Sequence, residues 1–466
     1  MVHKQVRGIE DTMTMQRMDI NALNNNELAD YIHALNILRA RSEQNPDDET
    51  GYDFQAGLHN GVFRDDEFIA CEHGSDLFLP WHRAHLHYFE QLLQAADPPR
   101  TANVTIPYWD WLHSEVNGRF PKAFSAPGLF KPGRNVNPAP GSPGEKLPAD
   151  TLEIVTEETD WNAFGGFPEG HPTGNFGRLE LGPHNNMHGF YISGLMGNPA
   201  TAAQDPIYWS FHCFIDLLWA EWQRRNNAPA PTSPDADLRG FLDKPKHKVQ
   251  DFQRTTELGY EYKYTELLEE AFGIIVVLPT LRRPPVRERR EFIAAAQPLN
   301  PQPLPPLFDD SIQSELRKTS RIAYSFPTPP GPTAAAVVRL QDLKVPTRWS
   351  YMLRAYVHPK DASFAQDDAS FERRYFVDYA VLWVSHHEED HDGHHPPEGR
   401  AHHPPFCTVQ FDVTDSLAGL TPEAISDLVL TLRYIAAPVP AGEPAPTLDL
   451  LEEVELDEVL LEPYTP

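Results

Sequence analysis

The chain has 466 residues, enough for two or three domains and for a core that needs no disulfide bonds. Its formal net charge of −28 disfavours nucleic acid and anionic lipid as partners, and no apolar run has the length of a membrane span. The three cysteines are an odd and sparse set that argues against a disulfide framework, whereas the 21 histidines include several short clusters.

The N-terminal sequence MVHKQVRGIEDTM has no apolar stretch of the signal-peptide type. We therefore expect a cytoplasmic protein. Export in complex with a helper protein would leave no mark in the sequence and stays open as an alternative.

Residues 1–278 carry the pattern of a mainly helical domain. Residues 27–41 place Leu28, Ile32, Leu35 and Leu38 at helical spacing, and Asn25 or Asn26 is the expected cap. A second helix is predicted over 80–96, beginning at Pro80, and a third from Asp205-Pro206 to about residue 225. A shorter helix holds His184 and His188, and the Pro- and Gly-rich stretch 118–150 is predicted to be a long loop.

The second half of the chain changes its pattern. Residues 279–332 are rich in proline and are predicted to be an extended linker. The segments AAVVRLQDL, SYMLRAYVH, YFVDYAVLWVSH, FCTVQFDV and LVLTLRYIA are typical of strands and predict a small antiparallel β domain over 333–437. The tail 438–466 is acidic and contains proline, and we expect it to be partly disordered or packed along the surface.

Histidines occur at spacings that suit metal binding. His73 precedes the Pro-started helix, His82 lies in its first turn, and His59 lies fourteen residues upstream of His73. Three imidazoles from a loop and a helix can converge on one ion of copper, zinc, iron or nickel. Each histidine taken alone is more often a structural residue of the core or the surface.

A second group of histidines follows. His184 and His188 are an i,i+4 pair on one helix face, and His212 lies in the third helix with Asp216 one turn further on. A carboxylate near a metal-bound imidazole can orient it through the other ring nitrogen, which is the role considered for Asp216. Two groups of three neutral ligands leave the charge of the metals for a bound anion, such as peroxide derived from O2.

The segment from His73 to Glu90 resembles the first copper motif of tyrosinases, catechol oxidases and molluscan-type haemocyanins, and Asp205 to Asp216 resembles the second, with Tyr208 where phenylalanine is usual. The resemblance covers about residues 5–265. It implies a four-helix-bundle core that holds two copper ions. The implied ligands are His59, His73 and His82 for one ion and His184, His188 and His212 for the other.

Smaller features extend the resemblance. Tyr260-Glu261-Tyr262 resembles the tyrosine motif that closes the catalytic domain of the family, with Arg7 as its expected N-terminal partner. Cys71-Glu72-His73 is similar to the Cys-x-His of fungal tyrosinases and molluscan haemocyanins, and implies a thioether between Cys71 and His73. The alternative is a buried free cysteine.

Monophenol hydroxylation needs a base, because free phenol has a pKa of roughly 10. In tyrosinases a glutamate and an asparagine hold a water that is thought to act as this base. Glu180 and Asn185 match these two residues by position. The alternative for Glu180 is a surface ion pair with Arg178 or another cation. Gly189 stands where some bacterial tyrosinases carry arginine, which removes a contact for a substrate carboxylate. Residues 196–199 align by position with the loop that flanks the substrate entrance.

In the family a C-terminal domain can cover the copper site until it is cleaved or displaced. We therefore expect a latent proenzyme, with residues 279–332 as a protease-accessible connection and Phe406 as the candidate aromatic plug. The histidine-rich run 386–403 is predicted to be a solvated loop, with adventitious metal binding or copper loading as alternatives.

These features predict a type-3 copper enzyme that o-hydroxylates monophenols and oxidises o-diphenols to o-quinones with O2. The alternatives are a catechol or aminophenol oxidase without monophenolase activity and a haemocyanin-like oxygen carrier. Carriers are secreted multi-unit chains with disulfides, which this chain does not resemble. A dizinc hydrolase would normally need a carboxylate or bridging water ligand and a general base.

Overall fold

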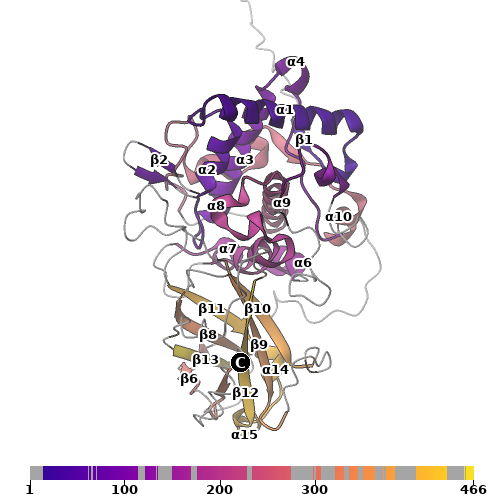
Figure 1. The fold of residues 1–466 in the computed structure, drawn as a ribbon. Coiled ribbons are helices and arrows are strands. Elements are labelled where there is room, and N and C mark those ends of the chain that lie inside the picture. Colours follow the sequence, from indigo (N-terminus) through magenta and orange to yellow (C-terminus); the bar gives the residue numbers. More distant parts are fainter. Residues whose placement is uncertain are drawn as a thin grey trace, which may run out of the picture.

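The computed structural model has a helical unit built from the first part of the chain and a β unit built from the last part (Figure 1). It describes residues 14–60, 62–64, 67–69, 71–113, 121–132, 134, 150–168, 176–227, 233–273, 297–298, 301–305, 321–329, 335–344, 350–362, 371, 374–383, 406–437, 456 and 458–465. None of the helices in these ranges is both long enough and apolar enough to cross a membrane. The predicted combination of a helical domain with a smaller antiparallel β domain is confirmed.

The helical unit contains both α-helices and short 3-10 and π-helical turns. Its α-helices are α1 (Asn25–Gln44), α2 (Tyr52–Asn60), α3 (Phe78–Gln94), α4 (Pro98–Thr101), α6 (Thr151–Glu157), α7 (Trp161–Gly165), α8 (Pro199–Ala202), α9 (Ile207–Asn226) and α10 (Glu266–Ala271). The shorter turns are η1 (Ile20–Ala22), η2 (Lys122–Ser125), η3 (Glu180–His184), η4 (Met187–Ile192), η5 (Leu195–Gly197), η6 (Val249–Phe252) and η7 (Thr255–Leu258). The expected helices over 80–96 and 205–225 are α3 and α9, and the expected short helix is the π-helical pair η3 and η4.

The N-cap of helix α1 lies one residue before the two predicted positions. Asn24, not Asn25 or Asn26, is the N-cap: its side chain accepts from the backbone N–H of Asn26 and of Glu27, and the Glu27 carboxylate accepts from Asn24 N at 2.8 Å. Such a reciprocal capping box needs an extended residue three positions before the glutamate, which only Asn24 satisfies.

Helices α3 and α9 pack against each other in the centre of this unit. The rings of Phe89 on α3 and Trp209 on α9 stack with centroids 3.5 Å apart. Both helices are buried along most of their length, as expected for the middle of a helical core. This packing fixes the relative positions of His82 on α3 and His212 on α9.

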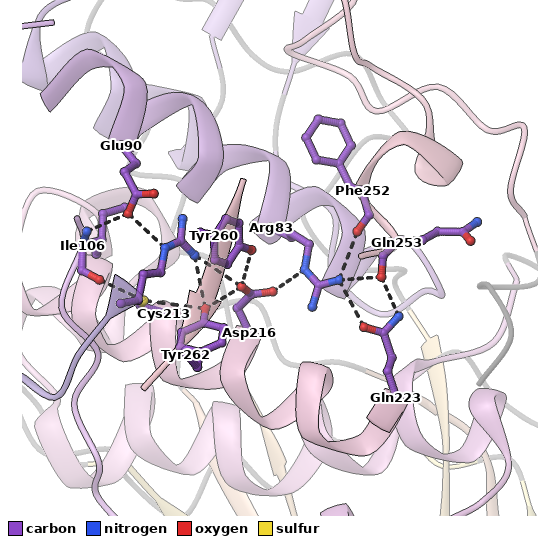
Figure 2. Close-up of polar contacts among 11 residues, drawn as sticks. Arg83, Glu90, Ile106, Cys213, Asp216, Gln223, Phe252, Gln253, Tyr260 and Tyr262 are labelled. Atoms are coloured by element: carbon purple, nitrogen blue, oxygen red, sulfur yellow. Dashed lines mark hydrogen bonds and ion pairs between the residues drawn. The ribbon is translucent and has the colours of Figure 1, made fainter. Parts of the chain in front are cut away.

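A buried ionic network joins the start and the end of the helical unit (Figure 2). The short strand β1 (Met15–Arg17) pairs in parallel with β4 (Tyr260–Tyr262). Arg17 donates to Glu90 on α3 at 2.9 Å and to Asp216 on α9 at 3.3 Å, and its guanidinium lies 3.6 Å from the centroid of the Tyr260 ring. Arg17 therefore holds the position expected for Arg7, which lies outside the described residues.

The β unit is a sandwich of two antiparallel sheets. One has the order β10 (Phe376–Leu382), β9 (Tyr351–Pro359), β12 (Leu428–Ala436) and β7 (Arg321–Ser325). The other has the order β11 (Phe406–Asp412), β8 (Ala335–Lys344), β13 (Glu458–Thr465) and β5 (Gln297–Pro298), with β6 (Gln302–Pro303) also paired to β13. Apolar residues of both sheets, such as Leu340 on β8 and Leu353 on β9, share one core. The remaining elements are α14 (Thr414–Leu417), α15 (Pro422–Ser426) and the hairpin β2 (Val62–Arg64) and β3 (Glu67–Ile69).

The predicted linker and tail both contribute strands to this unit. β5, β6 and β7 lie within 279–332, and β13 lies within 438–466. The sheets are therefore built from a longer part of the chain than 333–437. Proline argues against a strand in the sequence, and for this reason β5 and β6 were not predicted. Pro298 and Pro303 lie in two-residue strands beside β13, where a missing N–H donor is tolerated.

Candidate metal centre

Six buried histidines converge inside the helical unit. His59 lies on α2, His73 just before α3, His82 on α3, His184 at the end of η3, His188 on η4 and His212 on α9. None is more than 5 % exposed. The rings of His82 and His212 stack with centroids 4.4 Å apart, so α3 and α9 bring the two predicted groups into contact.

Backbone carbonyls fix the tautomer of three of these imidazoles. The Nδ1 atoms of His59, His82 and His188 each lie 2.8 Å from a carbonyl oxygen, those of Pro199, Phe78 and Met196 respectively. A carbonyl can only accept a hydrogen bond, so each Nδ1 carries the proton and each Nε2 carries a lone pair. This is the usual arrangement for a metal-binding histidine.

Two side chains do the same for His73 and His184. Glu180 accepts from His73 Nδ1 at 2.9 Å and from the backbone N–H of Gly74 at 2.9 and 3.1 Å. Asn185 Oδ1 accepts from His184 Nδ1 at 2.8 Å, while Asn185 Nδ2 donates to Val381 O at 2.8 Å. Both predicted catalytic residues therefore lie directly behind predicted copper ligands.

The structure corrects two readings of nearby carboxylates. Glu180 is 1 % exposed and burial raises its pKa well above the usual value, whereas Arg178 pairs with Glu153 and Glu158, so the surface ion pair is wrong. Asp216 does not orient His212: its carboxylate is taken by Arg17, Arg83, Tyr260 and Tyr262. Two buried guanidiniums attract a carboxylate more strongly than a neutral imidazole does.

The lone pairs of the histidines face one another. His59 Nε2 and His73 Nε2 lie 3.5 Å apart although both nitrogens are acceptors, and His82 Nε2 is buried without a hydrogen-bond partner. Burial, together with the other imidazoles, lowers the pKa of His82, His188 and His212 well below the usual value and keeps them neutral. Lone pairs gathered in this way can hold a cation between them, so the donor set fits metal ions.

The possible ligand atoms form three overlapping groups. Those of His184, His188 and His212, the predicted second set, lie within 4.8 Å of one another. The predicted first set is divided between the other two groups, which are His59, His82 and His212, and His59, Cys71 and His73. An all-imidazole set with no carboxylate suits copper or zinc better than calcium or magnesium. Cys71 is buried, which raises the pKa of its thiol, and its sulfur lies close enough to the His73 ring for the expected thioether to remain a prediction.

A residue of the β unit that the sequence did not single out lies among these histidines. Trp383, directly after β10, is 1 % exposed and stacks on His188 with centroids 4.1 Å apart and 21° between the planes. It also lies 5.3 Å from His73 and 5.5 Å from His184, and its Nε1 donates to Gly197 O at 2.9 Å. A tryptophan that follows an apolar strand is expected to be a core residue, so the sequence gives no sign that Trp383 lies at this site.

Phe406 as the aromatic plug stays a prediction. Phe406 begins β11 and pairs with Lys344 of β8, and its side chain lies outside the described residues. The histidine-rich run 386–403 also lies outside them, as does most of the expected loop 118–150.

Comparisons with known proteins identify the same family that the histidine motifs resemble. The family model "Common central domain of tyrosinase" matches residues 49–146 and 142–225. Tyrosinase HcTyr1 from Hahella sp. (strain CCB-MM4) is 32% identical over 243 residues, 46% of this chain and 51% of that protein. A tyrosinase from Streptomyces lincolnensis is 32% identical over 219 residues, 38% of this chain and 75% of the relative.

A solved structure shows that the likeness in fold extends through the β unit. Latent aurone synthase, a polyphenol oxidase, superposes with a TM-score of 0.64 at 16% identity, covering 99% of this chain and 92% of that one. The chain spans only about half the length of HcTyr1. The cofactor of tyrosinase-family proteins is a pair of copper ions, and the six histidines form groups that could hold metal ions. This chain belongs to the tyrosinase family.

Proposed function

We propose that this protein o-hydroxylates monophenols and oxidises o-diphenols to o-quinones with O2, and that its β unit holds it latent. The observation that carries the proposal is Trp383, an aromatic ring from the β unit stacked on His188 among six metal-ligand histidines. A flat ring in this place has the shape of the phenol ring that the reaction requires. When bound, the copper pair supplies the redox chemistry with O2.

The residues of the chain supply binding and orientation. The carbonyls of Pro199, Phe78 and Met196 hold the rings of their histidines in fixed directions, and Glu180 does so for His73. The six histidines are all buried, so the site is shielded from bulk water. A phenol that enters in place of Trp383 would stack on His188 in the same way.

Glu180 and Asn185 are proposed to hold a water that removes the phenol proton. In the closed state, with Trp383 among the histidines, Asn185 Nδ2 donates to Val381 O. Val381 lies on β10, the strand that Trp383 directly follows. Departure of the β unit would release this donor and the substrate space together. Latency would thus block both the binding of the phenol and its deprotonation.

The contact between the units has further anchors beside Trp383. Tyr379 on β10 donates to Asp150 at 3.0 Å, and Ser350 and Trp383 both lie within ordinary van der Waals range of where a Cβ on Gly189 would be. These contacts come from β10 and the start of β9, so that edge of the β unit forms the lid. Cleavage within 279–332 would leave these contacts in place, and activation would also require that they separate.

A diphenol-only oxidase is the second candidate. Both oxygens of Glu180 already accept from Gly74 N–H, and one also accepts from His73 Nδ1. This leaves the carboxylate fewer positions for a water than the monophenolase role needs. An aminophenol oxidase is included in this second candidate, because it likewise does not need the water that monophenol hydroxylation needs.

The test is oxygen uptake and quinone absorbance with the copper-loaded full chain, on a monophenol and its o-diphenol, before and after limited proteolysis. We expect little turnover of the intact chain and oxidation of both substrates once the lid has separated. Oxidation of the diphenol alone would favour the second candidate. Full activity of the intact chain, unchanged by proteolysis, would contradict latency, and reversible O2 binding without turnover would favour an oxygen carrier.

A further inference from the structure

A row of three arginines crosses one sheet of the β unit, away from the six histidines. Arg433 on β12 pairs with Arg354 on β9 on one side and with Arg321 on β7 on the other. Residues directly opposite each other on antiparallel strands lie on the same face, and neighbouring strands are about 4.8 Å apart. Leu432 and Tyr434, the chain neighbours of Arg433, belong to the core of the sandwich. The three arginines therefore lie on the face that points away from this core.

The row concentrates positive charge. Like charges directly opposite each other on neighbouring strands are destabilising, and no carboxylate in the described part of the chain pairs with Arg433. Burial lowers the pKa of Arg321, and Arg433 lowers it further. Burial also lowers the pKa of His358, a hydrogen bond to the backbone of Pro359 raises it, and Arg321 lowers it. The two pKa shifts indicate a local positive potential on this face of the sheet.

The surroundings of the row set its limits and its exposure. On β10 the next residue in the row is Tyr379, which pairs with Arg354 and donates to Asp150 of the helical unit at 3.0 Å. Arg354 and Arg433 are partly buried, and Arg321 is 8 % exposed. Because partial burial reduces the screening by water, an anion is attracted more strongly here than at an exposed arginine.

An aromatic ring supports one end of the row. The Arg354 guanidinium lies 4.6 Å from the centroid of the Phe376 ring, a cation–π contact that limits the positions the side chain can adopt. A guanidinium is planar and carries parallel N–H donors that match two oxygens of a phosphate group. A row of guanidiniums that is held in this way suits an anion with several oxygens better than a single halide ion.

We propose that Arg321, Arg354 and Arg433 bind a small oxyanion of the phosphate class. An anion between Arg433 and either neighbour offsets the repulsion along the row. The chain has a net charge of −28, which repels an extended anionic surface such as a membrane, whereas a small anion responds mainly to charges within about 10 Å. The site lies outside the metal centre and does not depend on the proposed function.

Calorimetric titration of the copper-loaded full chain with inorganic phosphate, in chloride buffer at constant ionic strength, tests the proposal. Arg433→Gln should weaken phosphate binding at least about tenfold, because it removes hydrogen bonds to a charged ligand. The matched control is Arg339→Gln in the other sheet, where Arg339 donates to Glu462 at 2.8 Å. This control should bind phosphate as tightly as the unmodified chain.

Thermal unfolding separates a binding role from a structural role. In phosphate-free buffer Arg433→Gln should unfold at the same temperature as the unmodified chain or at a higher one, because the substitution relieves repulsion. Phosphate should raise the unfolding temperature of the unmodified chain and not that of the variant. Arg433→Lys, which keeps the charge and loses the planar fork, should retain only part of the phosphate affinity, and it serves as the second variant if Arg433→Gln does not fold.

Three results would overturn the proposal. Phosphate binding that is unchanged in Arg433→Gln would place the anion elsewhere on the chain. A lower unfolding temperature of Arg433→Gln, with no response of the unmodified chain to phosphate, would make the arginine structural. Binding to vesicles that contain phosphatidic acid, but not to dissolved phosphate, would assign the row to a lipid headgroup.

Discussion

Trp383 lies face to face with His188, with ring centroids 4.1 Å apart, although the two residues come from different structural units. The core cluster of the helical unit includes this one tryptophan of the β unit. A side chain that completes the core of another unit ties the two together, and it also occupies the place that a phenol would need.

Replacing Trp383 should activate the full chain. In Trp383→Ala the ring and its bond to Gly197 O are both lost, so we expect o-diphenol oxidation by the copper-loaded chain to rise at least about tenfold without proteolysis. Oxygen uptake measures the effect. Phe371→Ala is the control for a cavity in the β unit, and equal activation by both variants would mean that general loosening, not unplugging, opens the site.

Latency should weaken as pH rises. Burial raises the pKa of Asp378 on β10 to about 7, while Arg178 lowers it and Asp150 and Glu153 raise it. An exposed aspartate has a pKa of about 3.9, so the closed state binds the proton more tightly than the open state. This stabilisation of the closed state is complete below about pH 4 and is lost as pH rises through about 7.

The activity of the full chain, divided by that of Trp383→Ala at the same pH, should therefore rise between pH 5 and pH 8, by up to roughly 80-fold from Asp378 alone. Asp378→Asn, which imitates the protonated form, should flatten the rise, whereas Asp361→Asn at an exposed position should not. Burial in the same contact raises the pKa of Asp150, which therefore contributes in the same direction. A flat ratio in the unmodified chain would contradict the prediction.

Cys71 should become bonded to His73 in the copper-loaded protein. Cys71 Sγ lies within 4.8 Å of a ring nitrogen of His73 and of one of His59. Mass spectrometry should find the intact chain lighter by two hydrogens and a linked peptide containing both residues. The bond should be absent in Cys71→Ser and unaffected by Cys213→Ser. An alkylatable Cys71 in fully active protein would rule it out.

Glu180 should govern copper retention through His73. Glu180→Leu removes the acceptor for His73 Nδ1, and loss of such a partner typically costs 10- to 100-fold in metal affinity. Glu180→Gln keeps an acceptor oxygen and should lose much less. Copper content after dialysis against a graded series of chelator concentrations measures the difference. Equal retention in the leucine and glutamine variants would show that the carboxylate does not position the ligand.

Arg17 should matter for stability and not for copper binding. Arg17→Met leaves the buried carboxylates of Glu90 and Asp216 short of a partner, a change that typically costs about 3–5 kcal/mol. Although burial raises the pKa of Asp216, Arg83 and Arg17 hold it below the usual value, so loss of Arg17 weakens that compensation. Denaturant unfolding measures the loss. A midpoint close to that of the unmodified chain would refute it, and Arg41→Met on α1 is the control.

Much of the site could be predicted from the sequence because its parts are local. The spacing of His184 and His188 places both on one helical face, and Pro80 near the start of α3 sets His82 one turn in. Alternation of apolar residues likewise indicated β8, β9 and β12. These patterns are fixed by the period of a helix or a strand, so neighbouring residues carry the information.

The remaining features depend on contacts between distant segments, and no local pattern reports them. Asp216 lies one turn after His212, yet two guanidiniums from β1 and α3 take its carboxylate, and Glu180 serves His73 from more than a hundred residues away. Arg17 in place of Arg7 follows from the pairing of β1 with β4. Trp383 reads as an ordinary core residue of a strand, and only the packing of the β unit on the helical unit brings it to His188. The sequence determined most of the candidate ligands, because His82, His184, His188 and His212 are placed by local helical spacing. The tertiary structure decided what orients and covers them, because buried charges and rings choose partners by proximity in space.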